Sequence, residues 1–308
     1  MRTYPNLANR AGRSEQLRSY LNEAYQRQCD TPDPPQPPSP PIGTLVQEVH
    51  RQIRDKIDFL CGSIRVLGMS QPIALEIIFT TVYILTTLRC RQDLEQINLV
   101  NSVLQNLRDR LHNVVVSPSK PGLEAVKNHQ NLIVLGKPGA GKTTFLKYLA
   151  MRCIEEGSNE QTSDANYLRQ FVPLFISLKD FTRDFAEASS IVDLLSYIVD
   201  RFELNYNEIE LILRQGRALV LLDGLDEIRE RERSQIIRQV ERFLERWGSY
   251  NNKFVITCRT NAIRYSFEQF TEVEIADFGD KQIQEFVKDW FNNIGECYKA
   301  KIFFDTFP

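Results

Sequence analysis

Residues Gly136–Thr143 read G-K-P-G-A-G-K-T, a complete phosphate-binding loop of the form G-x-x-x-x-G-K-[ST]. Glycines let the main chain wrap a triphosphate with its N–H groups pointing inward, and a helix N-terminus after the loop adds positive potential. In this chemistry Lys142 reaches the β- and γ-phosphates, and the Thr143 hydroxyl ligates Mg²⁺. We therefore expect a nucleoside triphosphate and Mg²⁺ as the bound groups.

Acidic residues supply the second half of this chemistry. The apolar run Ala218–Leu222 predicts a buried strand, and Asp223 follows it directly. A carboxylate at that edge of a sheet, beside the phosphate loop, can hold the hydration shell of Mg²⁺. Asp226 and Glu227 come three and four residues later and could orient or deprotonate an attacking water.

A third run, Lys253–Thr260, predicts another strand that ends in polar groups. Thr257 and Arg259 should lie at the same sheet edge as Asp223, because the carboxyl ends of parallel strands share one edge. An arginine there can sense a γ-phosphate or stabilise charge that develops in the transition state.

The elements around these residues predict how they are positioned. Asn131–Leu135 is a short apolar run typical of a buried parallel strand, and Thr144–Ile154 carries apolar residues at helical spacing. Strand-like runs recur at Val172–Leu178 and Val273–Ile275, and helical stretches such as Ile191–Phe202 and Glu230–Trp247 separate the strands. This alternation predicts an α/β fold, a three-layer sandwich with a parallel central sheet.

Composition narrows the class of protein. The 308 residues carry a formal charge of −2, which gives no reason to expect nucleic acid or an anionic membrane as a partner. Six scattered cysteines and three separated histidines favour reduced thiols over disulfides or a zinc site. There is no apolar signal core at the N-terminus, and Pro72–Leu88 is short for a membrane span and contains Glu76. We expect a cytoplasmic protein.

Composition also changes along the chain. We expect a short N-terminal helix in 1–30, a proline-rich linker in 31–43, a small helical domain in 44–115, the nucleotide domain in 122–275 and a partial helical lid in 276–308. In the helical domain, Thr44 and Gln47 form a capping-box pattern, and a second helix runs from about Gln92 to Leu111. The apolar Pro72–Leu88 element fits either a strand or a buried helix.

The motifs together resemble the NACHT family of signal-transducing NTPases, within the STAND group of AAA-like P-loop proteins. The resemblance lies in G-K-P-G-A-G-K-T-T-F-L-K-Y-L-A, V-P-L-F-I-S-L-K-D-F, V-L-L-D-G-L-D-E and F-V-I-T-C-R-T. It implies that Asp223 belongs to the metal shell, that Asp226 and Glu227 activate water and that Arg259 is the sensor arginine. It implies a nucleotide cradle of Gly136, Lys137, Pro138, Gly139, Ala140, Gly141, Lys142, Thr143 and Thr144.

Upstream, residues 45–97 resemble the N-terminal helical domain of cyanobacterial NACHT proteins, which could mediate self-association or contact a protein partner. Family members continue through a winged-helix domain and a ligand-sensing repeat array, whereas this sequence stops at Pro308. The resemblance therefore predicts a C-terminally truncated member.

Three functions remain open. The first is a switch that binds ATP and hydrolyses it slowly, as in bacterial stress or defence signalling. The others are an AAA-like ATPase that acts on a protein partner and a nucleotide-binding remnant without switch activity. The chain lacks the D-x-x-G and N-K-x-D pattern of Ras-type GTPases, which favours ATP over GTP. It also lacks the signature of ABC transporter ATPases, which argues against that class.

Overall fold

The computed structural model describes residues 41–64, 72–86, 120–155, 163–187, 193–260, 267, 269–293 and 295–306. The helix expected in 1–30, residues 31–40 of the linker and the helix expected at Gln92–Leu111 lie outside these residues. Within the described part, no helix is long and apolar enough to cross a membrane. Contacts group residues 42–308 into one unit.

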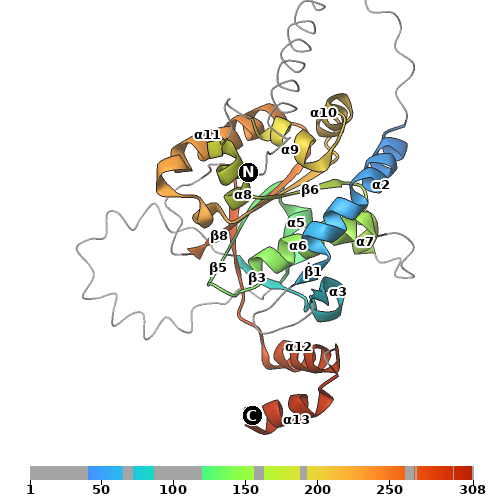
Figure 1. Ribbon diagram of the computed structural model, residues 1–308, viewed down its shortest axis with the longest axis vertical. Helices are drawn as coiled ribbons and strands as arrows, with labels where there is room; N and C mark the ends of the chain where they lie inside the picture. Colours follow the sequence, from blue (N-terminus) through green and yellow to red (C-terminus); the bar gives the residue numbers. More distant parts are fainter. Residues whose placement is uncertain are drawn as a thin grey trace, which may run out of the picture. The chain divides into compact units, whose positions relative to one another are not determined.

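A seven-stranded sheet forms the centre of the described residues, in the order β4-β3-β9-β5-β8-β7-β6 (Figure 1). Strands β9, β5, β8, β7 and β6 run parallel, while β3 pairs antiparallel with both β4 and β9. The expected parallel sheet is therefore confirmed, with β3 and β4 added at one side, of which β3 runs opposite to the other strands. The strands are β3 (Tyr83–Thr86), β4 (Lys120–Pro121), β5 (Asn131–Gly136), β6 (Val172–Ser177), β7 (Ala218–Asp223), β8 (Lys253–Arg259) and β9 (Thr271–Ile275).

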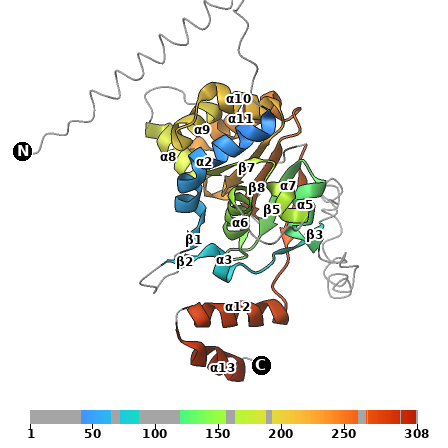
Figure 2. The ribbon, with the colours of Figure 1, turned by 90° about the vertical axis from the view of Figure 1, so that its right-hand side faces the viewer.

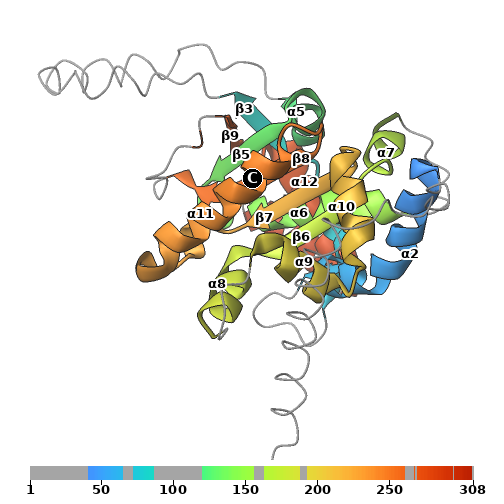
Figure 3. The same cartoon turned by 90° about the horizontal axis from the view of Figure 1, so that it is seen from above.

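Helices cover both faces of the sheet (Figures 1 and 3). The connection from β5 to β6 runs along the sheet in one direction, and the connections from β6 to β7 and β7 to β8 run back. Right-handed crossovers therefore place α6 on one face and α8 to α11 on the other. The helices are α5 (Gly122–Asn128), α6 (Lys142–Ile154), α7 (Ser163–Leu168), α8 (Leu178–Glu187), α9 (Leu194–Phe202), α10 (Tyr206–Arg214) and α11 (Glu230–Trp247).

The core follows the apolar spacing of the sequence. Strand β5 is buried along Leu132–Gly136, and α6 buries Phe145, Leu146, Leu149, Ala150 and Cys153, the residues at helical spacing. On the opposite face, the rings of Phe243 in α11 and Phe254 in β8 meet edge to face with centroids 6.2 Å apart. These contacts fix the helices that follow the loop and the acidic strand.

The helix α2 (Ile42–Cys61) packs into the same core, against α6 and β6. Figure 2 shows α2 next to α6. Its Ile53 and Ile57 are fully buried, and each such side chain stabilises the fold by about 1.5–3 kcal/mol relative to exposure. His50 Nε2 also lies 2.8 Å from the Phe171 carbonyl oxygen. The division into domains at 44–115 and 122–275 stays a prediction.

The structure corrects the predicted start of the first helix and resolves the open assignment of Pro72–Leu88. The capping box is wrong: α2 begins at Ile42, directly after Pro41, so Thr44 lies inside the first turn and does not cap it. A proline at the entry of a helix costs no hydrogen bond, because the first N–H groups have no partner within the helix. The element Pro72–Leu88 contains both alternatives, the short helix α3 (Leu75–Ile78) and strand β3.

The remaining elements lie at the two ends of the described residues. Strands β1 (Ser63–Ile64) and β2 (Ile73–Ala74) form a small antiparallel pair. Helices α12 (Asp280–Asn293) and α13 (Cys297–Thr306) follow β9 in the region expected to form the lid. Gln282 of α12 donates a hydrogen bond to the Thr81 carbonyl, 2.7 Å away, which holds α12 near the residues before β3.

Candidate functional site

The loop between β5 and α6 has the conformation that its glycines permit. Gly139 and Gly141 adopt φ of 79° and 85°, in the left-handed region that side chains disfavour. A Cβ atom at Gly136 would lie 3.2 Å from the Cβ atom of Ala140, so a side chain at this position would crowd the loop. Helix α6 begins at Lys142, and the N–H groups of its first turn have no partner within the helix. The loop can therefore offer main-chain donors to an anion.

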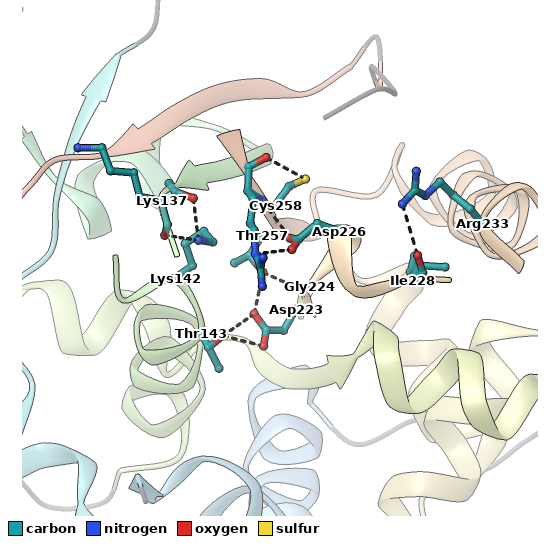
Figure 4. Close-up of polar contacts among 12 residues, drawn as sticks. Lys137, Lys142, Thr143, Asp223, Gly224, Asp226, Ile228, Arg233, Thr257 and Cys258 are labelled. Atoms are coloured by element: carbon teal, nitrogen blue, oxygen red, sulfur yellow. Dashed lines mark hydrogen bonds and ion pairs between the residues drawn. The ribbon is translucent and has the colours of Figure 1, made fainter. Parts of the chain in front are cut away.

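The Lys142 side chain spans the loop (Figure 4). Its Nζ donates to the main-chain oxygens of Gly136 and Lys137, each 2.8 Å away. Burial lowers the pKa of Lys142, and the nearby Asp226 carboxylate opposes this effect. The ammonium group is thus held at the mouth of the loop, where it can exchange two carbonyl partners for phosphate oxygens.

Asp223 ends β7 directly opposite the start of α6. The Thr143 hydroxyl donates to this carboxylate and lies 2.9 Å from Oδ2 and 3.1 Å from Oδ1 (Figure 4). Burial raises the pKa of Asp223, while hydrogen bonds from Thr257 and Thr143 act in the opposite direction. A hydroxyl and a carboxylate side by side form the hard oxygen set that Mg²⁺ prefers, so the residues present fit that ion.

Asp226 contacts the arginine that ends β8. Asp226 Oδ1 accepts the main-chain N–H of Arg259 at 3.0 Å, and Asp226 Oδ2 lies 2.9 Å from Arg259 Nε. The Asp226 side chain is 7% exposed and the Arg259 side chain 53% exposed, so one partner is fixed and the other reaches solvent. Glu227 has an exposed side chain in the same short helix, η1 (Leu225–Glu227).

The predicted residues thus lie at one edge of the sheet, at the carboxyl ends of β5, β7 and β8. Register places Gly136 opposite Arg259 across the β5–β8 pair. The loop comprises Gly136 at the end of β5, then Lys137, Pro138, Gly139, Ala140 and Gly141, and Lys142, Thr143 and Thr144 in the first turn of α6.

Two contacts at this edge were not predicted. Lys137 Nζ lies 2.8 Å from Asp277 Oδ2, which connects the loop with the segment between β9 and α12. Thr257, expected only as a polar group at this edge, donates to Asp223 Oδ1 at 2.7 Å. No pattern in the sequence pairs these residues, because each contact joins segments that are far apart along the chain.

The fold and this edge define a P-loop NTPase: a mostly parallel sheet carries a phosphate loop and an acidic strand end side by side. The family model described as "NACHT domain" matches residues 130–294, which is more than half of the sequence. This chain therefore belongs to the NACHT family and is a nucleotide-binding P-loop NTPase.

Solved structures similar to this chain include AMPPCP-bound DnaA from Aquifex aeolicus, with 18% identity and a TM-score of 0.35 over 56% of this chain and 49% of that chain. C. elegans PCH-2 has 16% identity and a TM-score of 0.32 over 64% and 49%. A single-residue variant of RuvB from Thermotoga maritima has 14% identity and a TM-score of 0.29 over 62% and 51%. The matched region spans about half the length of each of these chains. No curated protein matches this chain.

Proposed function

We propose that this chain binds ATP with Mg²⁺, hydrolyses it slowly and acts as a nucleotide-dependent signalling switch. The observation that carries the proposal is the convergence of Lys142, the Thr143–Asp223 pair and the Asp226–Arg259 pair at one sheet edge. These groups provide a cation for the phosphates, oxygen ligands for a metal and a second cation that a carboxylate holds in place.

Each residue has a definite task in this scheme. Lys142 and the N–H groups of the first turn of α6 bind the phosphates. Thr143 and Asp223 would hold Mg²⁺, which, when bound, neutralises charge that develops on the phosphate oxygens. Asp226 orients Arg259 toward the same edge, and Glu227, which is exposed beside it, accepts the proton of the attacking water.

The switch follows from the Asp226–Arg259 pair. A γ-phosphate attracts the arginine away from Asp226, whereas a diphosphate leaves the pair intact, so the two nucleotides stabilise different arrangements of this edge.

The choice of ATP over GTP rests on the absence of the guanine-binding motif from the sequence. Self-association, or a protein partner that contacts the N-terminal region, would convert this change into a signal. Mass measurement with ADP and with a non-hydrolysable ATP analogue tests that step.

Nucleotide binding is tested with Lys142→Ala, with Lys288→Ala, an exposed lysine on α12, as the control. Hydrogen bonds to charged groups contribute about 1.5–3 kcal/mol, so we expect affinity for a fluorescent ATP analogue to fall about 100-fold. Unlabelled ATP and GTP, used as competitors, measure the choice of base. Equal affinity in folded Lys142→Ala and Lys288→Ala proteins would refute the proposed site.

Binding of Mg²⁺ is tested by repeating the titration with wild-type protein in excess chelator. Affinity should fall when the metal is removed, because Thr143 and Asp223 then hold no cation for the phosphates. Affinity that is equal with and without the metal would exclude these two residues as its ligands.

A further inference from the structure

We infer that Thr257 is the positioning residue of this site, whose hydroxyl holds the Asp223 carboxylate in the orientation that faces Thr143. The inference rests on the proposed function, since it concerns how the same site binds its metal. Thr257 Oγ1 donates to Asp223 Oδ1 at 2.7 Å and accepts the main-chain N–H of Gly224 at 2.8 Å. Thr257 is 1% exposed, so water does not compete for these two bonds.

This hydroxyl lies where the pairing of β7 and β8 stops. The main-chain register of the two strands runs from Leu219 opposite Lys253 to Leu222 opposite Ile256. Beyond this pairing, Gly224 adopts φ of 81° and turns the chain toward η1. The Thr257 hydroxyl then provides the acceptor that the Gly224 N–H would otherwise lack. A buried N–H without an acceptor destabilises the fold, so the Gly224 N–H depends on the Thr257 hydroxyl.

The carboxylate is held from two sides. Thr257 binds Oδ1 from β8, and the Thr143 hydroxyl approaches from α6, slightly closer to Oδ2 than to Oδ1. Without Thr257 the carboxylate can rotate about its terminal bond, because a torsion to a planar group is only weakly restricted. Thr257 therefore acts through Asp223, the residue that would hold the metal together with Thr143.

Only a residue that both donates and accepts can fill this role. Valine has the shape of threonine but neither function, whereas serine keeps both and loses only a methyl group. The comparison of Thr257→Val with Thr257→Ser therefore separates the hydrogen bonds from the packing. Thr182 supplies a matched control, since it is 4% exposed and its hydroxyl donates to the Leu178 carbonyl within α8.

The experiment measures the affinity of a fluorescent ATP analogue with Mg²⁺ and with excess chelator. The ratio of the two affinities is the gain due to the metal. Loss of a group that orients a metal ligand typically costs 10- to 100-fold in metal affinity, so we expect the gain in Thr257→Val to fall about tenfold or more. The gain should be close to wild type in Thr257→Ser and Thr182→Val, and affinity in chelator should be unchanged in all variants.

A second readout uses the nucleotide-free protein. Amide hydrogen exchange at Gly224 should accelerate in Thr257→Val and stay slow in Thr257→Ser, because only serine keeps the acceptor. If Thr257→Val does not fold, Thr257→Ala replaces it, since the smaller side chain lets water reach the Gly224 N–H.

The outcomes separate the inference from the proposed function. A wild-type gain in Thr257→Val, or a loss in Thr257→Ser as large as in Thr257→Val, overturns the role of Thr257 and leaves the nucleotide site in place. A wild-type protein that binds no nucleotide overturns both.

Discussion

Replacing Asn252 with alanine should destabilise the fold and spare the nucleotide site. Asn252 is fully buried directly before β8 and makes three hydrogen bonds to the main chain. Its Oδ1 accepts the N–H of Ala218 at the start of β7, and its Nδ2 donates to the oxygens of Leu213 and Trp247, at the ends of α10 and α11. One amide thus joins two strands and two helices at the amino ends of the strands, whereas the site lies at their carboxyl ends.

The loss of folding stability in Asn252→Ala can be calculated from these contacts. A net value of about 1 kcal/mol for each of three bonds gives about 3 kcal/mol, and the N–H of Ala218 is left buried without an acceptor. This is a large part of the ~5–15 kcal/mol by which a folded domain is usually stable. For a chain of this size, about 2–4 °C per kcal/mol predicts a fall of about 6–12 °C in the melting temperature.

The control is Asn251→Ala, which changes the same residue type at the neighbouring, exposed position. Surface substitutions usually change stability by less than about 0.5 kcal/mol, so this variant should melt close to wild type. Circular dichroism gives both melting temperatures, and titration with the ATP analogue below them should give equal affinities. If Asn252→Ala melts no lower than Asn251→Ala, the contacts of Asn252 do not hold the sheet edge as we argue.

Two further predictions concern chemistry. Glu227→Gln should keep nucleotide affinity near wild type and slow phosphate release by about 10²–10⁴-fold, because the base is removed; a wild-type rate would place water activation elsewhere. Iodoacetamide at pH 8 should modify Cys297 before Cys258, as followed by peptide mass spectrometry. Cys297 is exposed, whereas burial raises the pKa of Cys258 to about 11, and equal rates at the two cysteines would contradict this reasoning.

The strands and the phosphate loop were predictable because their signals are local. The apolar runs that predicted β5 to β9 agree with the structure to within a few residues at each end. The motif at Gly136–Thr143 needs only consecutive residues, since glycine at fixed positions permits the loop and the following turn starts a helix. Asp223 and Arg259 could be placed at one edge because both follow buried strands that run parallel.

The antiparallel edge was not predictable from the same patterns. Strand β3 is only four residues long and pairs with β9, about 190 positions further along the chain. The apolar run Pro72–Leu88 that contains it fits a strand by its β-branched residues and a buried helix by its length, and the partner strand decides for β3. Thr44 is the opposite case. A local capping pattern predicted that the helix begins after Thr44, but the helix begins at Ile42.

The sequence by itself therefore determined which residues are candidates to bind phosphate and metal and which strands carry them. Tertiary structure decided which side chains meet: Thr257 with Asp223, Asp226 with Arg259, and Lys137 with Asp277. The physical reason is distance along the chain. A hydrogen bond depends on a few tenths of an ångström between atoms of separate elements, and only the packed sheet fixes that spacing.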